Sequence, residues 1–172
     1  MSLLIDGFNL IYKFPELEAF MCYGQLNKAR DGLLEILRDY QKIRKGGITV
    51  VFDGKKEPSI EIRSEKIGTI DVYYSLDYSA DFIIKQFIKK DLNPKMITVI
   101  TSDKDIIFYI NRFGAKNITS EKFADIVNHS FESSITEEEE RKEELEKINP
   151  EITDEEISYW QKIFTKKSSG KR

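Results

Sequence analysis

The sequence is poor in the residues that build disulfides and zinc sites. Its 172 residues include one cysteine, Cys22, and one histidine, His129. A single cysteine forms no disulfide within the chain, and the two residues together are too few for a Cys/His zinc cluster. His129 comes late in the sequence, which disfavours a Ser/His/Asp mechanism and suggests a residue on a helix surface. We expect a protein of the reducing cytoplasm.

Long apolar runs, nucleotide-binding glycine motifs and a strong net charge are absent as well. No apolar segment reaches the roughly 18 residues of a membrane helix, and Asp6 comes before a signal-peptide core could form. We therefore expect a chain that is neither exported nor anchored. Neither GxxxxGK[ST] nor GxGxxG is present, which disfavours nucleoside triphosphates and dinucleotides as ligands. With 27 basic and 30 acidic residues, any nucleic-acid site must be a local patch.

Three short apolar runs are the strongest structural signal in the sequence. Residues 2–5, 48–52 and 96–101 are rich in β-branched side chains and show no polar alternation, which is typical of central parallel strands covered on both faces. Residues 69–74 and 115–118 predict two more strands, the second at an edge of the sheet.

Helical periodicity separates these strands. The clearest case is the stretch from Leu26 to Tyr40, where apolar residues recur at helical spacing before a Gly-Gly stop. Further helices are predicted over residues 79–91, 105–114 and 120–131. The alternation of strands and helices predicts an α/β fold with a central, mainly parallel sheet flanked by helices.

The composition changes near residue 132. Thr136 with Glu139 forms a capping box that predicts a new, solvated helix or a flexible linker, and Thr153 with Glu156 predicts the start of an amphipathic helix. That helix carries one apolar stripe, made of Ile157, Trp160, Ile163 and Phe164. We assign residues 1–131 to the α/β domain, and residues 132–172 to a charged linker and a C-terminal amphipathic helix with a basic tail. We expect this helix to dock on its own domain or on a protein partner.

Acidic residues follow the predicted strands. Asp6, Asp53 and Asp103 come directly after the three apolar runs or one residue later, and Asp81 lies in the first turn of the helix over 79–91. Each has a structural explanation of its own, as a turn residue, a helix cap or a partner of the helix dipole. Ligands of open α/β sheets, however, bind outside the carboxyl ends of the strands, where these four side chains should meet.

Carboxylates gathered at one edge repel one another unless a cation lies among them. Oxygen ligands without histidine or cysteine suit Mg²⁺ or Mn²⁺, which can orient and deprotonate a water for attack on a phosphodiester. The pattern therefore predicts nuclease chemistry.

Five segments, taken in order, resemble a known family. LLIDGFNLIYKFPEL, NKARDGLLEILRDYQ, ITVVFDG, the SAD of residues 79–81 and the TSD of residues 101–103 are similar to the YacP-like members of the NYN branch of PIN-domain nucleases. The resemblance covers residues 2–131 and implies a PIN-like three-layer sandwich with a metal-dependent endoribonuclease site. It implies catalytic roles for Asp6, Asp53, Asp81 and Asp103, the first, third and fourth of them as ligands of Mg²⁺ or Mn²⁺.

Several other residues are candidates for contacts with RNA. Asn9 could hold its loop or contact a phosphate, and Ser102 could orient a water or cap the next helix. Basic side chains that could bind phosphates, or be solvated instead, follow Asp53: Lys55, Lys56, Arg63 and Lys66. Arg30 could pair with Asp31 or face the site. The aromatic residues that could stack on bases, or pack in the core, are Tyr12, Phe14, Tyr73 and Tyr74.

The sequence thus predicts a cytoplasmic, metal-dependent endoribonuclease whose RNA is met either free or on a ribosome. The alternative is a catalytically silent module of the same fold that binds RNA or a ribosomal partner. Retention of all four acidic residues favours the enzyme, because without a cation their mutual repulsion has no compensation.

Overall fold

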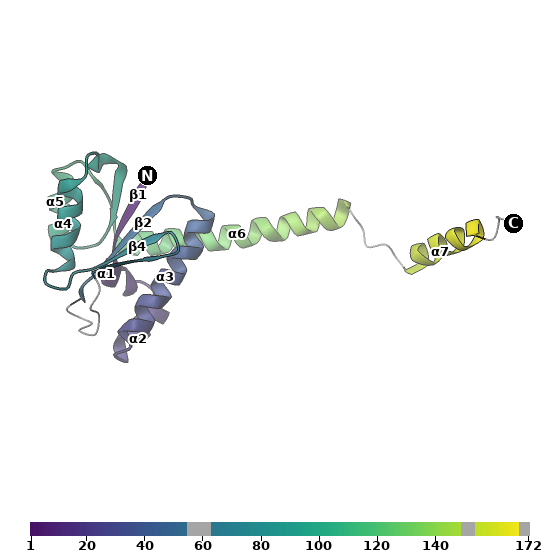
Figure 1. The fold of residues 1–172 in the computed structure, drawn as a ribbon, viewed down its shortest axis with the longest axis horizontal. Helices are drawn as coiled ribbons and strands as arrows, with labels where there is room; N and C mark the ends of the chain where they lie inside the picture. The colour runs from purple at the N-terminus through teal and green to yellow at the C-terminus, as the bar shows by residue number, and fades with distance from the viewer. Residues whose placement is uncertain (55–62, 149–153, 169–172) are drawn as a thin grey trace. The chain divides into compact units, whose positions relative to one another are not determined.

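A mainly parallel sheet occupies the centre of the domain (Figure 1). The computed structural model describes residues 1–54, 63–148 and 154–168. The strands within these ranges run in the order β3-β4-β2-β1-β5-β6, and every neighbouring pair is parallel except β3 with β4. Their bounds are β1 Ser2–Asp6, β2 Gly47–Phe52, β3 Ser64–Ile67, β4 Ile70–Tyr74, β5 Ile97–Ile100 and β6 Lys116–Ile118. The predicted α/β class is confirmed.

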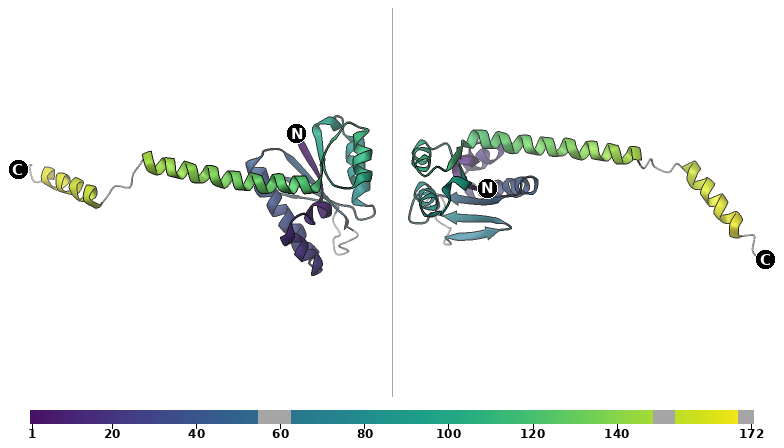
Figure 2. Two further views of the ribbon diagram at one scale, coloured as in Figure 1. Left: turned by 180° about the vertical axis from the view of Figure 1, so that it is seen from behind. Right: turned by 90° about the horizontal axis from the view of Figure 1, so that it is seen from above.

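Helices cover both faces of this sheet, which makes three layers (Figure 1, Figure 2). One face packs against α1 (Gly7–Ile11), α2 (Pro15–Cys22), α3 (Leu26–Ile43) and the first turns of α6 (Ser120–Ile148). The other face packs against α4 (Ala80–Lys90) and α5 (Lys104–Asn111). Successive strand residues point to opposite faces, so a strand covered on both sides needs an unbroken apolar run.

The edge strand β3 was not predicted. Its sequence, SEKI, is polar and half-exposed, and it pairs antiparallel with β4 through a tight turn in which Gly68 adopts a φ of +63°. The Tyr74 hydroxyl of β4 donates a hydrogen bond to Glu65 of β3. An edge strand that faces solvent carries no apolar run, so the sequence pattern gave no signal.

Helix α1 was also not predicted, and it depends on a glycine. It begins at Gly7, directly after Asp6, and its buried face is formed with Phe8 and Leu10. A Cβ at position 7 would overlap the ring of Phe52. Gly7 is therefore required for space, which lets α1 lie against the end of β2.

The chain divides into two compact units, residues 1–132 and 133–172. Helix α6 continues without a break through Thr136, so the predicted helix start there is wrong. Inside a helix, the N–H groups of the Thr136 region have acceptors in the preceding turn. The charged residues that follow are good helix formers, and opposite charges such as Glu137 and Arg141 stand at the favourable i,i+4 spacing. These residues are exposed.

A last helix, α7, spans Asp154–Ser168. Its predicted cap, Thr153, lies outside the described residues. Ile157 and Trp160 are 43% and 53% exposed, and docking of this helix stays a prediction. Within the part of the chain that the structure describes, no helix combines the length and the apolar composition that crossing a membrane requires.

Candidate functional site

A pocket of about 260 Å³ lies at the carboxyl ends of the strands. Its walls come from the end of β1, from α1, from the residue after β2 and from the first turns of α4 and α5. The lining residues are Asp6, Phe8, Asn9, Tyr12, Asp53, Ser79, Ala80, Asp81, Asp103 and Ile106. All four predicted aspartates therefore line one pocket.

The sheet topology explains why the pocket is there. The chain leaves β1 to build β2 on one side and later returns to build β5 on the other. Crossover connections on opposite sides diverge at such a point and leave a crevice outside the strand ends. Asp6 lies at the end of β1, and Asp53 and Asp103 follow its two neighbours.

A buried threonine connects two of the aspartates. Thr101 is fully buried, and its Oγ1 donates to Asp6 Oδ2 at 3.2 Å and accepts from the backbone N–H of Asp103 at 3.1 Å. Asp103 is the N-cap of α5, and its Oδ1 accepts from the N–H groups of Asp105 at 2.8 Å and Ile106 at 3.4 Å. The capping explanation for Asp103 is therefore correct, and Asp103 also lines the pocket.

Asp81 has one oxygen paired and one without a partner. Its Oδ2 lies 2.9 Å from Lys85 Nζ, an ion pair within α4, while its Oδ1 is buried and accepts no hydrogen bond. Lys85 is itself 24% exposed and lies 5.5 Å from the centre of the Tyr109 ring. A buried carboxylate oxygen without a donor is unusual, and a bound cation or an ordered water would satisfy it.

The donor set of this pocket fits a hydrated divalent cation. Within the described residues, no three or more His, Cys, Asp or Glu side chains are arranged to hold an ion directly. Mg²⁺ is usually held by one or two carboxylates and keeps several waters, each taking about 30 Å³. The pocket volume accommodates such a shell, and the oxygen donors and the partnerless Asp81 Oδ1 match its chemistry.

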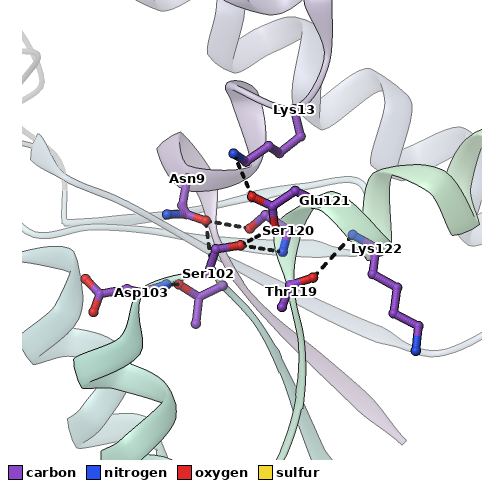
Figure 3. A network of polar contacts seen from close by, with 9 residues as sticks. Asn9, Lys13, Ser102, Asp103, Thr119, Ser120, Glu121 and Lys122 are labelled. Atoms are coloured by element: carbon purple, nitrogen blue, oxygen red, sulfur yellow. Dashed lines mark hydrogen bonds and ion pairs between the residues drawn. The ribbon is translucent and has the colours of Figure 1, made fainter.

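Asn9 is fixed by a polar network at the start of α6 (Figure 3). Its Oδ1 accepts from the Ser102 N–H at 3.0 Å and from the Ser120 hydroxyl at 2.6 Å, and Ser120 is fully buried. Ser102 Oγ in turn accepts from the Ser120 N–H at 3.0 Å and donates to Glu121. With the oxygen held in this way, the Asn9 side chain has a defined orientation at the pocket wall.

Glu121 closes the network by an ion pair. Its carboxylate lies 2.8 Å from Lys13 Nζ, which joins the start of α6 to the loop between α1 and α2. Hydrogen bonds from Lys13 and Ser102 lower the pKa of Glu121 from its ordinary value of 4.5 to about 2. The carboxylate is therefore ionised at neutral pH and holds both donors.

Among the described polar and basic residues that were predicted to contact the substrate, only Asn9 lines the pocket. Asn9 lines the pocket, whereas Ser102 does not: its hydroxyl belongs to the network, and the cap of α5 is Asp103. Arg63 is 81% exposed and lies 3.5 Å from Asp77, outside the lining. Lys55 and Lys56 lie outside the described residues.

Most of the remaining candidates pair with or pack against other residues of the domain. Arg30 pairs with Asp31 at 3.4 Å, and its guanidinium lies 5.8 Å from the centre of the Tyr74 ring. Lys66 pairs with Asp71 at 3.3 Å. Phe14 and Tyr74 are buried, and Tyr73 packs edge to face on Phe87. Tyr12 is 44% exposed and is the one aromatic candidate of this set that lines the pocket.

Sequence reasoning missed three residues that organise the site: Thr101, Ser120 and Lys85. Lys85 could have been found, because it follows Asp81 by four positions on a predicted helix. Thr101 and Ser120 carry no such signal, since their partners are distant in sequence. His129, as predicted, lies on a helix surface, where it faces Glu132 at 3.9 Å.

Comparison with known proteins gives the same fold and a family. No curated protein matches the chain in sequence. Among solved structures, Rae1 (YacP) from Bacillus subtilis is similar, with a TM-score of 0.66 and 24% identity over 99% of this chain and 95% of that one. A tryptophan-to-leucine variant of the same protein gives a TM-score of 0.63 and 23% identity, over 88% of this chain and 84% of that one. The model of the YacP-like NYN domain matches residues 3–165, and the chain therefore belongs to the YacP-like NYN domain family.

Proposed function

We propose that this protein is a metal-dependent endoribonuclease that hydrolyses RNA phosphodiester bonds in the acidic pocket. The observation that carries the proposal is the gathering of four aspartates in one pocket, with Asp81 Oδ1 buried and without a hydrogen-bond partner. Membership of the NYN domain family, whose fold is PIN-like, supports a nuclease. Mg²⁺ or Mn²⁺ is the proposed cofactor.

Asp6, Asp81 and Asp103 would hold the cation, in part through its waters. Asp53 would add a fourth carboxylate to the pocket lining. When bound, such an ion orients and acidifies an attacking water and stabilises charge on the phosphate. The protein's own part is positioning: Thr101 holds Asp6 and the backbone at Asp103, and Lys85 holds one oxygen of Asp81.

Asn9 is proposed to contact the substrate. Since its Oδ1 accepts both of the hydrogen bonds from Ser102 and Ser120, the amide N–H donors of the same side chain are directed away from that network. In the pocket wall they suit a phosphate oxygen of RNA. Lys55 and Lys56 are proposed as further phosphate contacts, and Arg63 as a weaker one, because it is paired with Asp77.

The proposed setting is the cytoplasm, where the protein would bind RNA that is either free or on a ribosome. A catalytically silent RNA- or ribosome-binding module remains the second candidate for this fold. The gathering of four carboxylates in one pocket favours the enzyme, because without a cation their mutual repulsion has no compensation.

The test compares cleavage of labelled single-stranded and hairpin RNAs with Mn²⁺, Mg²⁺ or a chelator. Asp81→Asn should lower the rate by roughly 100-fold or more, because a metal ion contributes several kcal/mol to such reactions. Asp39→Asn is the matched control, since Asp39 also pairs with a lysine on its own helix, at 2.7 Å, but does not line the pocket. Mn²⁺ binding, followed by electron paramagnetic resonance, should weaken in the first variant alone.

Cleavage that is equal in the native protein and in Asp81→Asn would refute the carboxylate mechanism. RNA binding without cleavage under every metal condition would support the silent module.

A further inference from the structure

Two exposed aromatic rings stack on each other at the start of α4, next in sequence to residues that line the acidic pocket. Tyr78 is 55% exposed and Phe82 is 40% exposed. Their ring centres lie 4.6 Å apart, and the ring planes differ by 22°. The two rings together form a small contiguous apolar patch, and larger patches of this kind mark sites of interaction.

The sequence positions of the two rings bracket the pocket wall. Tyr78 directly precedes Ser79, the N-cap of α4, and Phe82 directly follows Asp81. Ser79, Ala80 and Asp81 all line the pocket, and the Ser79 hydroxyl accepts the N–H of Phe82 at 3.1 Å. Tyr78 and Phe82 thus flank three residues of the pocket wall in sequence, although neither residue lines the pocket itself.

The pair is not part of the core. The buried face of α4 is formed by Ala80, Ile84 and Ile88, and Phe82 lies off that stripe. Aromatic packing in the core on this helix is provided instead by Phe87, whose ring meets Tyr73 edge to face at 4.8 Å. Packing of the domain therefore does not explain why two flat rings are kept in water next to Asp81.

We infer that Tyr78 and Phe82 form a stacking platform for unpaired RNA bases, which places the neighbouring phosphate at the acidic pocket. This inference rests on the proposed function in one respect, namely that RNA is the substrate. The exposed rings offer the flat apolar face on which a base stacks, and such stacking is tolerant of sequence.

A single strand fits this surface and a duplex does not. The bases of a duplex are already stacked inside the helix and present no free face, whereas unstacked bases of loops and single strands can be splayed onto aromatic side chains. Tyr12, which directly follows α1 and lines the pocket, is a third exposed ring in this region. The substrate class assigned by this geometry is single-stranded RNA or the loop of a hairpin.

The test measures binding in the Asp81→Asn background, so that affinity is read without cleavage. The probes are a short single-stranded RNA, the same strand with abasic sites, and a duplex of equal length. The double variant Tyr78→Leu, Phe82→Leu keeps apolar bulk but removes both flat faces. It should weaken single-strand binding by about 5- to 150-fold, the range expected for loss of base stacking. Duplex binding should change little.

Two further variants keep the test independent of folding. Tyr78→Trp retains a flat ring and should bind the single strand as tightly as the parent. Tyr23→Leu changes a tyrosine that is 81% exposed after the end of α2 and is absent from the pocket wall, and it should have no effect. The double variant should bind the strand with abasic sites as tightly as the parent does. The bases that would stack on the two rings have already been removed from that strand.

The inference is overturned if the parent does not bind the single strand, if the double variant binds it as tightly as the parent, or if Tyr23→Leu causes an equal loss. A loss that persists on the abasic strand would also overturn it. Failure of the proposed function has a different signature, which is undiminished cleavage by Asp81→Asn with Tyr78 and Phe82 intact.

Discussion

Thr101 offers the sharpest test of how this site is held together. Its hydroxyl makes two hydrogen bonds inside the protein, one to the Asp6 carboxylate at 3.2 Å and one from the Asp103 N–H at 3.1 Å. Thr101→Val keeps the shape of the side chain and removes only these two bonds. A bond to a charged group contributes about 1.5–3 kcal/mol and a neutral one about 0.5–1.5 kcal/mol, so the expected loss in the free energy of unfolding is about 2–4 kcal/mol.

The strand that Thr101 directly follows supplies a control of opposite sign. Thr98, in β5, is also buried, but its Oγ1 has no hydrogen-bond partner. Thr98→Val removes an unsatisfied buried hydroxyl and should leave the stability unchanged or raise it by about 1 kcal/mol. The same chemical change should therefore destabilise the protein at position 101 and not at position 98.

Urea denaturation and thermal unfolding measure both effects. For a chain of this size 1 kcal/mol corresponds to about 2–4 °C, so Thr101→Val should lower the thermal midpoint by roughly 4–16 °C. Equal shifts for Thr98→Val and Thr101→Val, or a loss below about 1 kcal/mol at position 101, would refute the role given to this hydroxyl.

Three further predictions concern the surroundings of the pocket. Gly7→Ala should lower the unfolding free energy by about 1–3 kcal/mol in urea, because its Cβ would overlap the Phe52 ring; an unchanged midpoint contradicts this. The low pKa of Glu121 means that native protein should be more stable than Glu121→Gln above pH 4.5, with the difference vanishing as the pH falls toward 2; a gap independent of pH contradicts this. Ser120→Ala removes the 2.6 Å bond to Asn9 and should cost about 1 kcal/mol in urea and slow RNA cleavage; native cleavage would show that Asn9 needs no such support.

Local patterns predicted much of the domain because buried elements leave repeated marks in a sequence. The apolar runs at residues 48–52 and 96–101 correspond to β2 and β5, and the periodicity from Leu26 to Tyr40 lies within α3. The failures fall where such marks are absent or misleading. Strand β3 is polar because it is at an edge, and Thr136 resembles a cap yet lies inside a helix whose preceding turns already satisfy its backbone.

The sequence by itself determined that four aspartates follow predicted strands or begin a helix, and parallel topology then brings such positions to one edge of the sheet. Only the tertiary structure decided what each one contacts. Asp6 and Thr101 are joined across 95 positions, and Asn9 and Ser120 across 111. A hydrogen bond depends on distance in space and leaves no periodic trace between such partners, whereas the hydrophobic burial that forms strands and helices is repeated along the chain.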